Sequence, residues 1–311
     1  MRIRMDIAYD GTGFHGWAKQ PGLRTVQGEL EKALNTLLIH RRENQMGAFE
    51  KLHVTVAGRT DTGVHAAHQV THFDVDENLL QHCVGYLNLD GISALEHRLR
   101  HILPSDIAIL SLSQAPEGFD ARFSALERTY IYRIFDGNCK ADPRLRNCVL
   151  TVRGSLNVEA MDNAVQLIIG LHDFGSFATA NPGGTTIRKV KSAHWIRTIP
   201  ENDEFRASTS TKEVARTKSN ILSLPGMIMF TIVADAFAHN MVRSLTNACV
   251  SIGLGKRTKE WFGRKINTPL REGSTGPIEP CGLTLEHVQY PPDDELAIRA
   301  AAIKAKRSLD D

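Results

Sequence analysis

The sequence contains no Cys-x-x-Cys pair, and its five cysteines are widely spaced along 311 residues. This pattern argues against a disulfide scaffold and against a cysteine-based zinc site, and it is typical of a reducing compartment. The first ten residues alternate like a strand and lack the apolar core of a signal peptide. We therefore expect a protein of the cytoplasm.

Long apolar runs and nucleotide-binding loops are also absent. The most apolar stretch, residues 221–238, is broken by Pro225, Gly226 and Asp235, so we expect no membrane span. Neither a P-loop nor a dinucleotide fingerprint occurs, which argues against a nucleotide cofactor. With 42% hydrophobic and 23% charged residues, the chain has the composition of one large or two medium globular domains.

A large excess of charge of one sign is missing too, since the formal net charge is only +2. Basic residues nonetheless form three clusters in the second half: Arg188, Lys189 and Lys191; Lys212, Arg216 and Lys218; and Lys256, Arg257, Lys259, Arg264 and Lys265. Each cluster alone is typical of a solvated face. Three of them in one half are also compatible with a track for an RNA backbone.

Hydrophobic periodicity gives a similar order of elements twice. In the first half it predicts strands at 2–9, 53–57, 69–75 and 107–112, a helix at 26–38 capped by Thr25, and a helical region at 78–102. In the second half it predicts strands at 128–135, 188–197, 226–235 and 283–290, and helices at 156–171 and 241–252. Residues 200–224 are polar and aperiodic, and we interpret them as a surface loop.

Each half therefore has the order β-α-β-β-α-β, which is ferredoxin-like. The predicted fold class is α+β, with two ferredoxin-like units flanking a central active-site cleft. We assign residues 1–112 to an N-terminal unit, 113–290 to a C-terminal unit and 291–311 to a tail with a short charged helix.

Residues 57–66 carry the clearest sign of chemistry. Gly58 and Gly63 allow backbone angles closed to other residues, so we expect a shaped loop that presents Arg59 and Asp61. An aspartate on a tight loop at a strand end is well placed to reach a substrate. The same residues also suit a plain turn in which Asp61 binds its own backbone. Local chemistry leaves both interpretations open.

A family resemblance decides between them. Gly58-Arg-Thr-Asp-Thr-Gly-Val-His-Ala66 resembles the signature of the TruA-type tRNA pseudouridine synthases. Further motifs are similar to that family in the same order: Tyr9-Asp-Gly-Thr-Gly-Phe-His-Gly-Trp17, Thr25-Val-Gln-Gly-Glu-Leu-Glu-Lys-Ala-Leu34, Ala121-Arg-Phe-Ser-Ala125 with Arg128-Thr-Tyr-Ile-Tyr132, His172-Asp-Phe-Gly-Ser-Phe177, Ala236-Phe-Ala-His-Asn-Met-Val-Arg243 and Gly282-Leu-Thr-Leu-Glu-His-Val-Gln-Tyr290. The resemblance thus covers nearly the whole chain.

The resemblance implies the pseudouridine synthase fold and an isomerase that acts on uridine in RNA. It implies that Asp61 is the nucleophile, which attacks the ribose anomeric carbon or the uracil ring, or assists glycal formation. Arg243 would grip the Asp61 carboxylate, and Tyr130 would stack on the flipped-out uracil. Leu283 would form an apolar wall of the pocket, and Arg59 would fill the gap left by the extruded base.

The family also implies a substrate and partners. It modifies uridines on the 3′ side of the tRNA anticodon stem-loop, and it acts as a homodimer with one RNA spanning both subunits. The isomerisation gains and loses no atom, so we expect no cofactor. RNA binding is expected to rest on shape and phosphate contacts and to weaken steeply with salt.

Four residues depart from the family pattern. Ala18 replaces a usual Gln, Ser244 and Asn247 replace Asn and Gly, and Thr284 replaces an aromatic residue. The residues with implied catalytic roles match the pattern. We therefore expect these departures to affect packing near the pocket and the range of substrates.

A metal-dependent hydrolase is one alternative from another class. His65, His68 and His72 are spaced three and four apart, with His15 and His53 elsewhere. Two of them have the parity of a strand, and no fitting carboxylate accompanies them. Structural or RNA-facing roles are therefore favoured.

A non-catalytic RNA-binding module is the second alternative, since ferredoxin-like units often bind RNA. The intact set of Asp61, Tyr130 and Arg243 argues against it.

Overall fold

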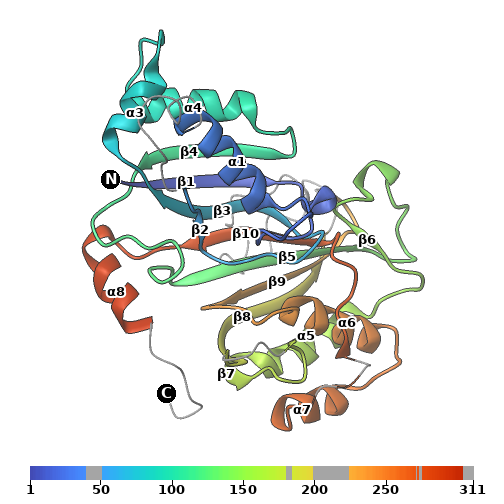
Figure 1. The fold of residues 1–311 in the computed structure, drawn as a ribbon. Coiled ribbons are helices and arrows are strands. Elements are labelled where there is room, and N and C mark those ends of the chain that lie inside the picture. Colours follow the sequence, from blue (N-terminus) through green and yellow to red (C-terminus); the bar gives the residue numbers. More distant parts are fainter. Residues whose placement is uncertain (40–50, 180–183, 199–223, 271, 273–274, 304–311) are drawn as a thin grey trace, which may run out of the picture. The chain divides into compact units, whose positions relative to one another are not determined.

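The computed structural model describes residues 1–39, 51–179, 184–198, 224–270, 272 and 275–303. The chain is a mixed α+β protein whose strands pair mostly antiparallel (Figure 1). It divides into two compact units, Met1–Thr129 with His287–Asp311, and Tyr130–Glu286. The chain passes between the units within strands β5 (Glu127–Phe135) and β10 (Leu283–Gln289). The domain limits expected from the sequence, at residues 112 and 290, stay a prediction.

The first unit contains strands in the order β4-β1-β3, with β2 beside β3. Helices α1, α3 and α4 pack on one another, and α4 packs on β4 (Figure 1). The elements of this unit are β1 (Arg2–Tyr9), η1 (Gly11–Gly13), α1 (Val26–Leu38), β2 (Thr55–Val56), β3 (His65–Asp74), α3 (Glu77–Val84), α4 (Gly91–Ile102), β4 (Ile107–Gln114) and α8 (Leu296–Ile303). In β1, Ile3, Met5 and Ile7 are fully buried, as a strand with one face in the core requires.

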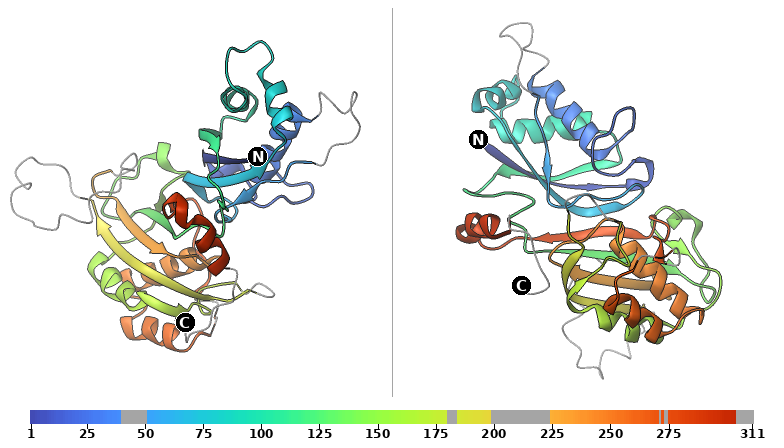
Figure 2. Two further views of the ribbon diagram at one scale, coloured as in Figure 1. Left: turned by 90° about the vertical axis from the view of Figure 1, so that its left-hand side faces the viewer. Right: turned by 60° about the horizontal axis from the view of Figure 1, so that its bottom comes forward.

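The second unit contains the strand order β5-β9-β8-β7, with β6 parallel to β5. Helix α5 packs on β8, α6 and α7, and Figure 2 shows the three helices close together. The elements that complete this unit are β6 (Leu150–Thr151), α5 (Val158–Val165), η3 (Gln166–Ile168), β7 (Gly170–Asp173), β8 (Ile187–Arg197), β9 (Ile228–Ala234), α6 (Met241–Gly253) and α7 (Lys259–Asn267). A stacked pair, Trp195 and Phe230, lies in the core with ring centroids 4.6 Å apart.

Two predicted helical regions differ from the structure. The region 78–102 is two helices, since Gly85 adopts φ 59° after α3 and Asp90 caps α4 by accepting hydrogen bonds from two main-chain N–H groups. The region 156–171 ends early, because α5 stops at Val165, the 3₁₀ turn η3 follows, and Ile169 is already extended before strand β7 begins.

The other predicted strands and helices lie within a few residues of their expected positions. The cap at Thr25 is confirmed, since its side chain accepts from Gly28 N–H at 3.2 Å. The sequence did not predict α7, β6 or β7, and most of the proposed surface loop at 200–224 lies outside the described residues. Strands β6 and β7 are additional to the β-α-β-β-α-β order expected for the second half. The two ferredoxin-like units therefore stay a prediction. Among the described residues, no helix combines the length and apolar character needed to cross a membrane.

Candidate active site

The loop that carries Asp61 links β2 to β3 in the first unit and contains a tight turn. Val64 N–H donates to the carbonyl of Asp61 at 3.1 Å, and Gly63 adopts φ 76° within the turn. The side chain of Asp61 is half-buried, while that of the neighbouring Arg59 is exposed. The special backbone angle expected at Gly63 is therefore confirmed, whereas Gly58 does not adopt a positive φ.

Tyr9, at the end of β1, and the segment that follows it hold this loop on both sides of Asp61. The Tyr9 hydroxyl is hydrogen-bonded to Thr60 Oγ1 at 2.8 Å. Trp17 N–H donates to the Thr60 carbonyl at 3.0 Å, and Gly63 N–H donates to the Phe14 carbonyl at 3.2 Å. Burial raises the pKa of Tyr9 to about 12, so its hydroxyl stays protonated and can hold this bond at neutral pH.

Two polar side chains outside the loop bind the main chain of its first residues, Ala57 and Gly58. Arg128 Nη2 donates to the Ala57 carbonyl at 2.6 Å, and Gln69 Nε2 donates to the Gly58 carbonyl at 2.8 Å. Sequence reasoning assigned no role to Tyr9, Gln69 or Arg128. Tyr9 and Arg128 do lie in family-like motifs, which was the available signal.

Gly11 contacts the far end of the loop so closely that no side chain fits. A Cβ atom at Gly11 would lie 2.0 Å from the Val64 carbonyl oxygen, and Gly11 N–H donates to His65 Nδ1 at 3.1 Å. We expect Gly11→Ala to displace the turn that follows Asp61 and to lower kcat by about 10- to 100-fold, because small displacements of reacting groups are costly.

The matched control for Gly11→Ala is Gly263→Ala in α7, where the nearest atom to the new Cβ would be Leu167 Cδ1 at 3.5 Å. Steady-state rates on the same RNA compare the two variants. Wild-type kcat in the Gly11→Ala enzyme would show that the position of this loop does not limit the reaction.

The second unit places Tyr130 on β5 among aromatic residues. Tyr130 is only 7% exposed, and its ring packs edge-on against Phe237 with centroids 5.0 Å apart. Tyr132 on the same strand is fully buried and donates to the Glu279 carbonyl at 2.5 Å. Tyr132 is thus a core aromatic.

Arg243 lies in the first turn of α6, and its guanidinium is held by the protein. Its Nε donates to the Ile278 carbonyl at 2.7 Å, and Nη1 donates to Asn240 Oδ1 at 3.2 Å. Asn240 precedes the helix with φ 63°, an unusual conformation for a residue other than glycine. These two bonds restrict the guanidinium far more than a plain surface arginine would require. Leu283 is buried at the start of β10 in the same unit.

Residues 164–291 match the model of a family described as tRNA pseudouridine synthase. The chain is 56% identical over 308 residues to tRNA pseudouridine synthase A of Bifidobacterium longum (strain DJO10A), and the match covers 99% of each chain. It is 40% identical over 310 residues to the protein of the same name from Streptomyces avermitilis, with 99% and 95% covered. The chain belongs to the tRNA pseudouridine synthase family. It is therefore an RNA pseudouridine synthase, an isomerase.

Two of the four departures of this synthase from the family pattern, Thr284 and Asn247, form hydrogen bonds in the second unit. Thr284 Oγ1 accepts from Arg133 Nη1 at 3.3 Å, and Arg133 forms an ion pair with Glu286 at 2.7 Å in which both side chains are 3% exposed. Asn247 Nδ2 donates to the Gly276 carbonyl at 2.8 Å. The threonine thus supplies a hydroxyl to a buried charged group, where the family has an aromatic residue.

The histidines that suggested a metal site bind protein groups in the synthase. His68 Nε2 lies 3.0 Å from Asp6 Oδ2, and His65 Nδ1 accepts from Gly11 N–H. His72 Nδ1 accepts from a main-chain N–H at 3.0 Å, and burial lowers its pKa. Across the described part of the chain, no three His, Cys, Asp or Glu side chains are arranged to hold a metal ion.

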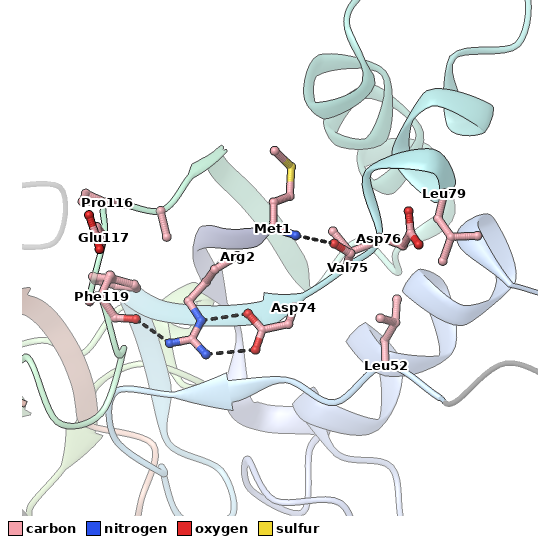
Figure 3. Close-up of a pocket in the computed structure, with 12 residues that line it drawn as sticks. Met1, Arg2, Leu52, Asp74, Val75, Asp76, Leu79, Pro116, Glu117 and Phe119 are labelled. Carbon is pink, nitrogen blue, oxygen red and sulfur yellow. Dashed lines mark hydrogen bonds and ion pairs between the residues drawn. The ribbon is translucent and has the colours of Figure 1, made fainter. Parts of the chain in front are cut away.

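A cavity of about 740 Å³ opens in the first unit beside the N-terminus (Figure 3). Several of its polar groups are paired: Arg2 donates twice to Asp74 and once to the Phe119 carbonyl, and the Met1 amino group donates to the Val75 carbonyl at 2.7 Å. None of the residues implicated in catalysis lines it. We assign the cavity no part in the reaction.

Proposed function

We propose that this synthase converts uridines on the 3′ side of the tRNA anticodon stem-loop to pseudouridine. The proposal rests on the 56% identity, over 99% of the chain, to an enzyme named tRNA pseudouridine synthase A. That similarity spans both Asp61 and the segment from Tyr130 to Leu283.

In the proposed reaction Asp61 is the nucleophile on a flipped-out uridine. The bond from ribose C1′ to uracil N1 breaks, the uracil turns, and C1′ joins C5. The proton on C5 is lost, and N1 gains one, so the product is an isomer and no redox partner is required. A carboxylate suits this role because it is ionised at neutral pH and is a tolerable leaving group in the second step.

The other residues would bind and orient the uridine. Two hydrogen bonds hold the guanidinium of Arg243 in place. A guanidinium held in this way can position a carboxylate for attack. Tyr130 offers an aromatic face for stacking on uracil, and Leu283 an apolar wall. The exposed Arg59, two residues before the nucleophile, would occupy the space that the flipped base leaves in the RNA.

The assembly implied by the family completes the proposal. We propose a cytoplasmic homodimer in which one tRNA spans both subunits. Within each subunit, ferredoxin-like units at residues 1–112 and 113–290 would flank one active-site cleft.

Incubation of the purified chain with single tRNA transcripts tests the substrate assignment. Pseudouridine is mapped at nucleotide resolution, and we expect it only on the 3′ side of the anticodon stem-loop. Transcripts with cytidine at those positions serve as the control and should gain none. Pseudouridine confined to another arm, or its absence from every tRNA, would contradict the proposal.

A further inference from the structure

The turn after α6 and the outer face of α7 form a basic surface, defined by Lys256, Arg257, Lys259, Arg264 and Trp261. Residues 256–265 contain five basic residues and one acidic residue, whereas the whole chain has 37 and 35. All four of the cations in this α7 surface are exposed. The local charge is therefore far from the near-neutral balance of the chain.

Glu260 lies among these cations and interacts electrostatically with Arg264 and Lys259, so their charge is balanced only in part. No carboxylate lies within 4.0 Å of the side-chain nitrogens of Lys256, Arg257, Lys259 or Arg264 among the described residues. Lys265 shows the contrast, since it is 8% exposed and forms a 2.6 Å ion pair with Glu272. The remaining excess of positive charge repels itself unless a polyanion binds it, which makes a binding role the better account.

The α7 surface is held in a fixed shape. Lys256 N–H and Arg257 N–H both donate to the Ser251 carbonyl, at 2.9 and 3.2 Å, and Gly255 adopts φ 71° to allow this turn. On the inner face of α7, the buried Phe262 packs against Phe177 with ring centroids 5.4 Å apart. The cations are thus presented on a rigid support, which lowers the entropic cost of binding.

An aromatic ring lies among the cations. The guanidinium of Arg257 sits 5.3 Å from the centroid of Trp261, which is half-exposed. Trp261 and Arg264 also line a cavity of about 400 Å³ on this face. Cations interleaved with an exposed indole are typical of surfaces that bind RNA strands, where phosphates pair with the cations and a base stacks on the ring.

The turn that begins the α7 surface lies at the opposite end of α6 from Arg243. Both lie in the second unit, and α6 rises by roughly 15 Å between Arg243 and Gly253, before the turn with Lys256 and Arg257. An RNA whose uridine lies near Arg243 would meet this turn with other nucleotides.

We propose that the α7 surface is a second RNA contact, which binds phosphates of the substrate tRNA outside the modified nucleotide and stacks one unpaired base on Trp261. This inference rests on the proposed tRNA substrate. Residues 256–265 are the third basic cluster of the sequence. The inference gives this cluster a role in substrate binding, whereas a solvated face would need none.

The test compares tRNA binding of the full-length chain with that of two variants and one control. The first variant is Lys256→Gln/Arg257→Gln/Lys259→Gln, and the second is Trp261→Ala. The control, Lys140→Gln/Arg144→Gln/Arg146→Gln, removes three exposed cations from another part of the same unit. Affinity is measured between about 50 and 200 mM salt, where counterion release dominates.

The triple α7 variant should reduce the slope of log K against log salt by about 2, since each lost phosphate contact in a single strand contributes about 0.7. Trp261→Ala should weaken binding roughly tenfold with little change in slope, because stacking carries no counterion release. Both variants should keep wild-type kcat at saturating tRNA and an unchanged melting temperature. The control should keep the wild-type slope.

Unchanged tRNA binding in the α7 variants would overturn the inference. The remaining candidate partner for this surface would then be an acidic protein. Equal loss in the control would also overturn it, because net charge alone would then explain the effect. If the wild-type chain bound tRNA through this surface but formed no pseudouridine in it, the proposed function would fail while the RNA contact stood.

Discussion

Asp61→Ala should abolish pseudouridine formation while leaving tRNA affinity nearly unchanged. Loss of a covalent nucleophile lowers kcat by at least ~10³-fold in enzymes where it has been removed cleanly. The loop itself should persist, because Tyr9 and Trp17 bind Thr60 and Phe14 binds Gly63. Single-turnover rates and equilibrium binding on the same tRNA measure the two effects separately.

Asp74→Asn is the matched control for Asp61→Ala. Asp74 lies in the same unit, its side chain is 64% exposed, and it pairs with Arg2 at 2.8 Å. Loss of such an exposed pair changes stability by about 1 kcal/mol or less. We expect wild-type rates in this variant. Substantial turnover by the Asp61→Ala enzyme would remove Asp61 from the role of nucleophile.

Arg243→Lys should lower kcat/KM by about 100-fold although it keeps the positive charge. Arginine can donate to the Ile278 carbonyl and to Asn240 Oδ1 and still present further N–H groups, whereas an ammonium has neither the planar fork nor the reach. A carboxylate oriented by such a fork would lose its alignment, and misalignment of reacting groups is penalised in the rate.

Arg100→Lys provides the comparison for Arg243→Lys, since Arg100 is 52% exposed and forms only an i,i+4 pair with Glu96. That variant should be indistinguishable from wild type in rate and melting temperature. If Arg243→Lys retained most of the wild-type kcat/KM, bidentate positioning by Arg243 would be ruled out.

The sequence was enough to predict which segments form helices and which form strands, but not where some of the helices end. Apolar spacing continued past Gly85 and Gly170, so periodicity alone extended the helices through both positions. Gly85 adopts a positive φ that ends α3, whereas α5 gives way to the 3₁₀ turn η3 before Gly170 is reached. Both ends depend on tertiary packing. Helix α7 was missed because its short apolar stripe, with Phe262 and Ile266 buried, is embedded in a strongly basic segment.

The candidate nucleophile was found through its motif, but the residues that support its loop were not. Tyr9 meets Thr60 across 51 positions of the sequence, and Arg128 meets Ala57 across 71. No local pattern encodes contacts of that range. Sequence resemblance therefore identified which residue to test, and the structure adds which side chains hold it in place.

The central claim is that this chain makes pseudouridine in the tRNA anticodon arm through Asp61. The most direct test maps pseudouridine in total RNA from cells that lack the protein and are complemented with either the wild-type chain or Asp61→Ala. The account predicts loss confined to the 3′ side of the anticodon stem-loop, restored by the wild-type chain and not by the variant. Restoration by Asp61→Ala, or loss at sites outside the anticodon arm, would contradict it.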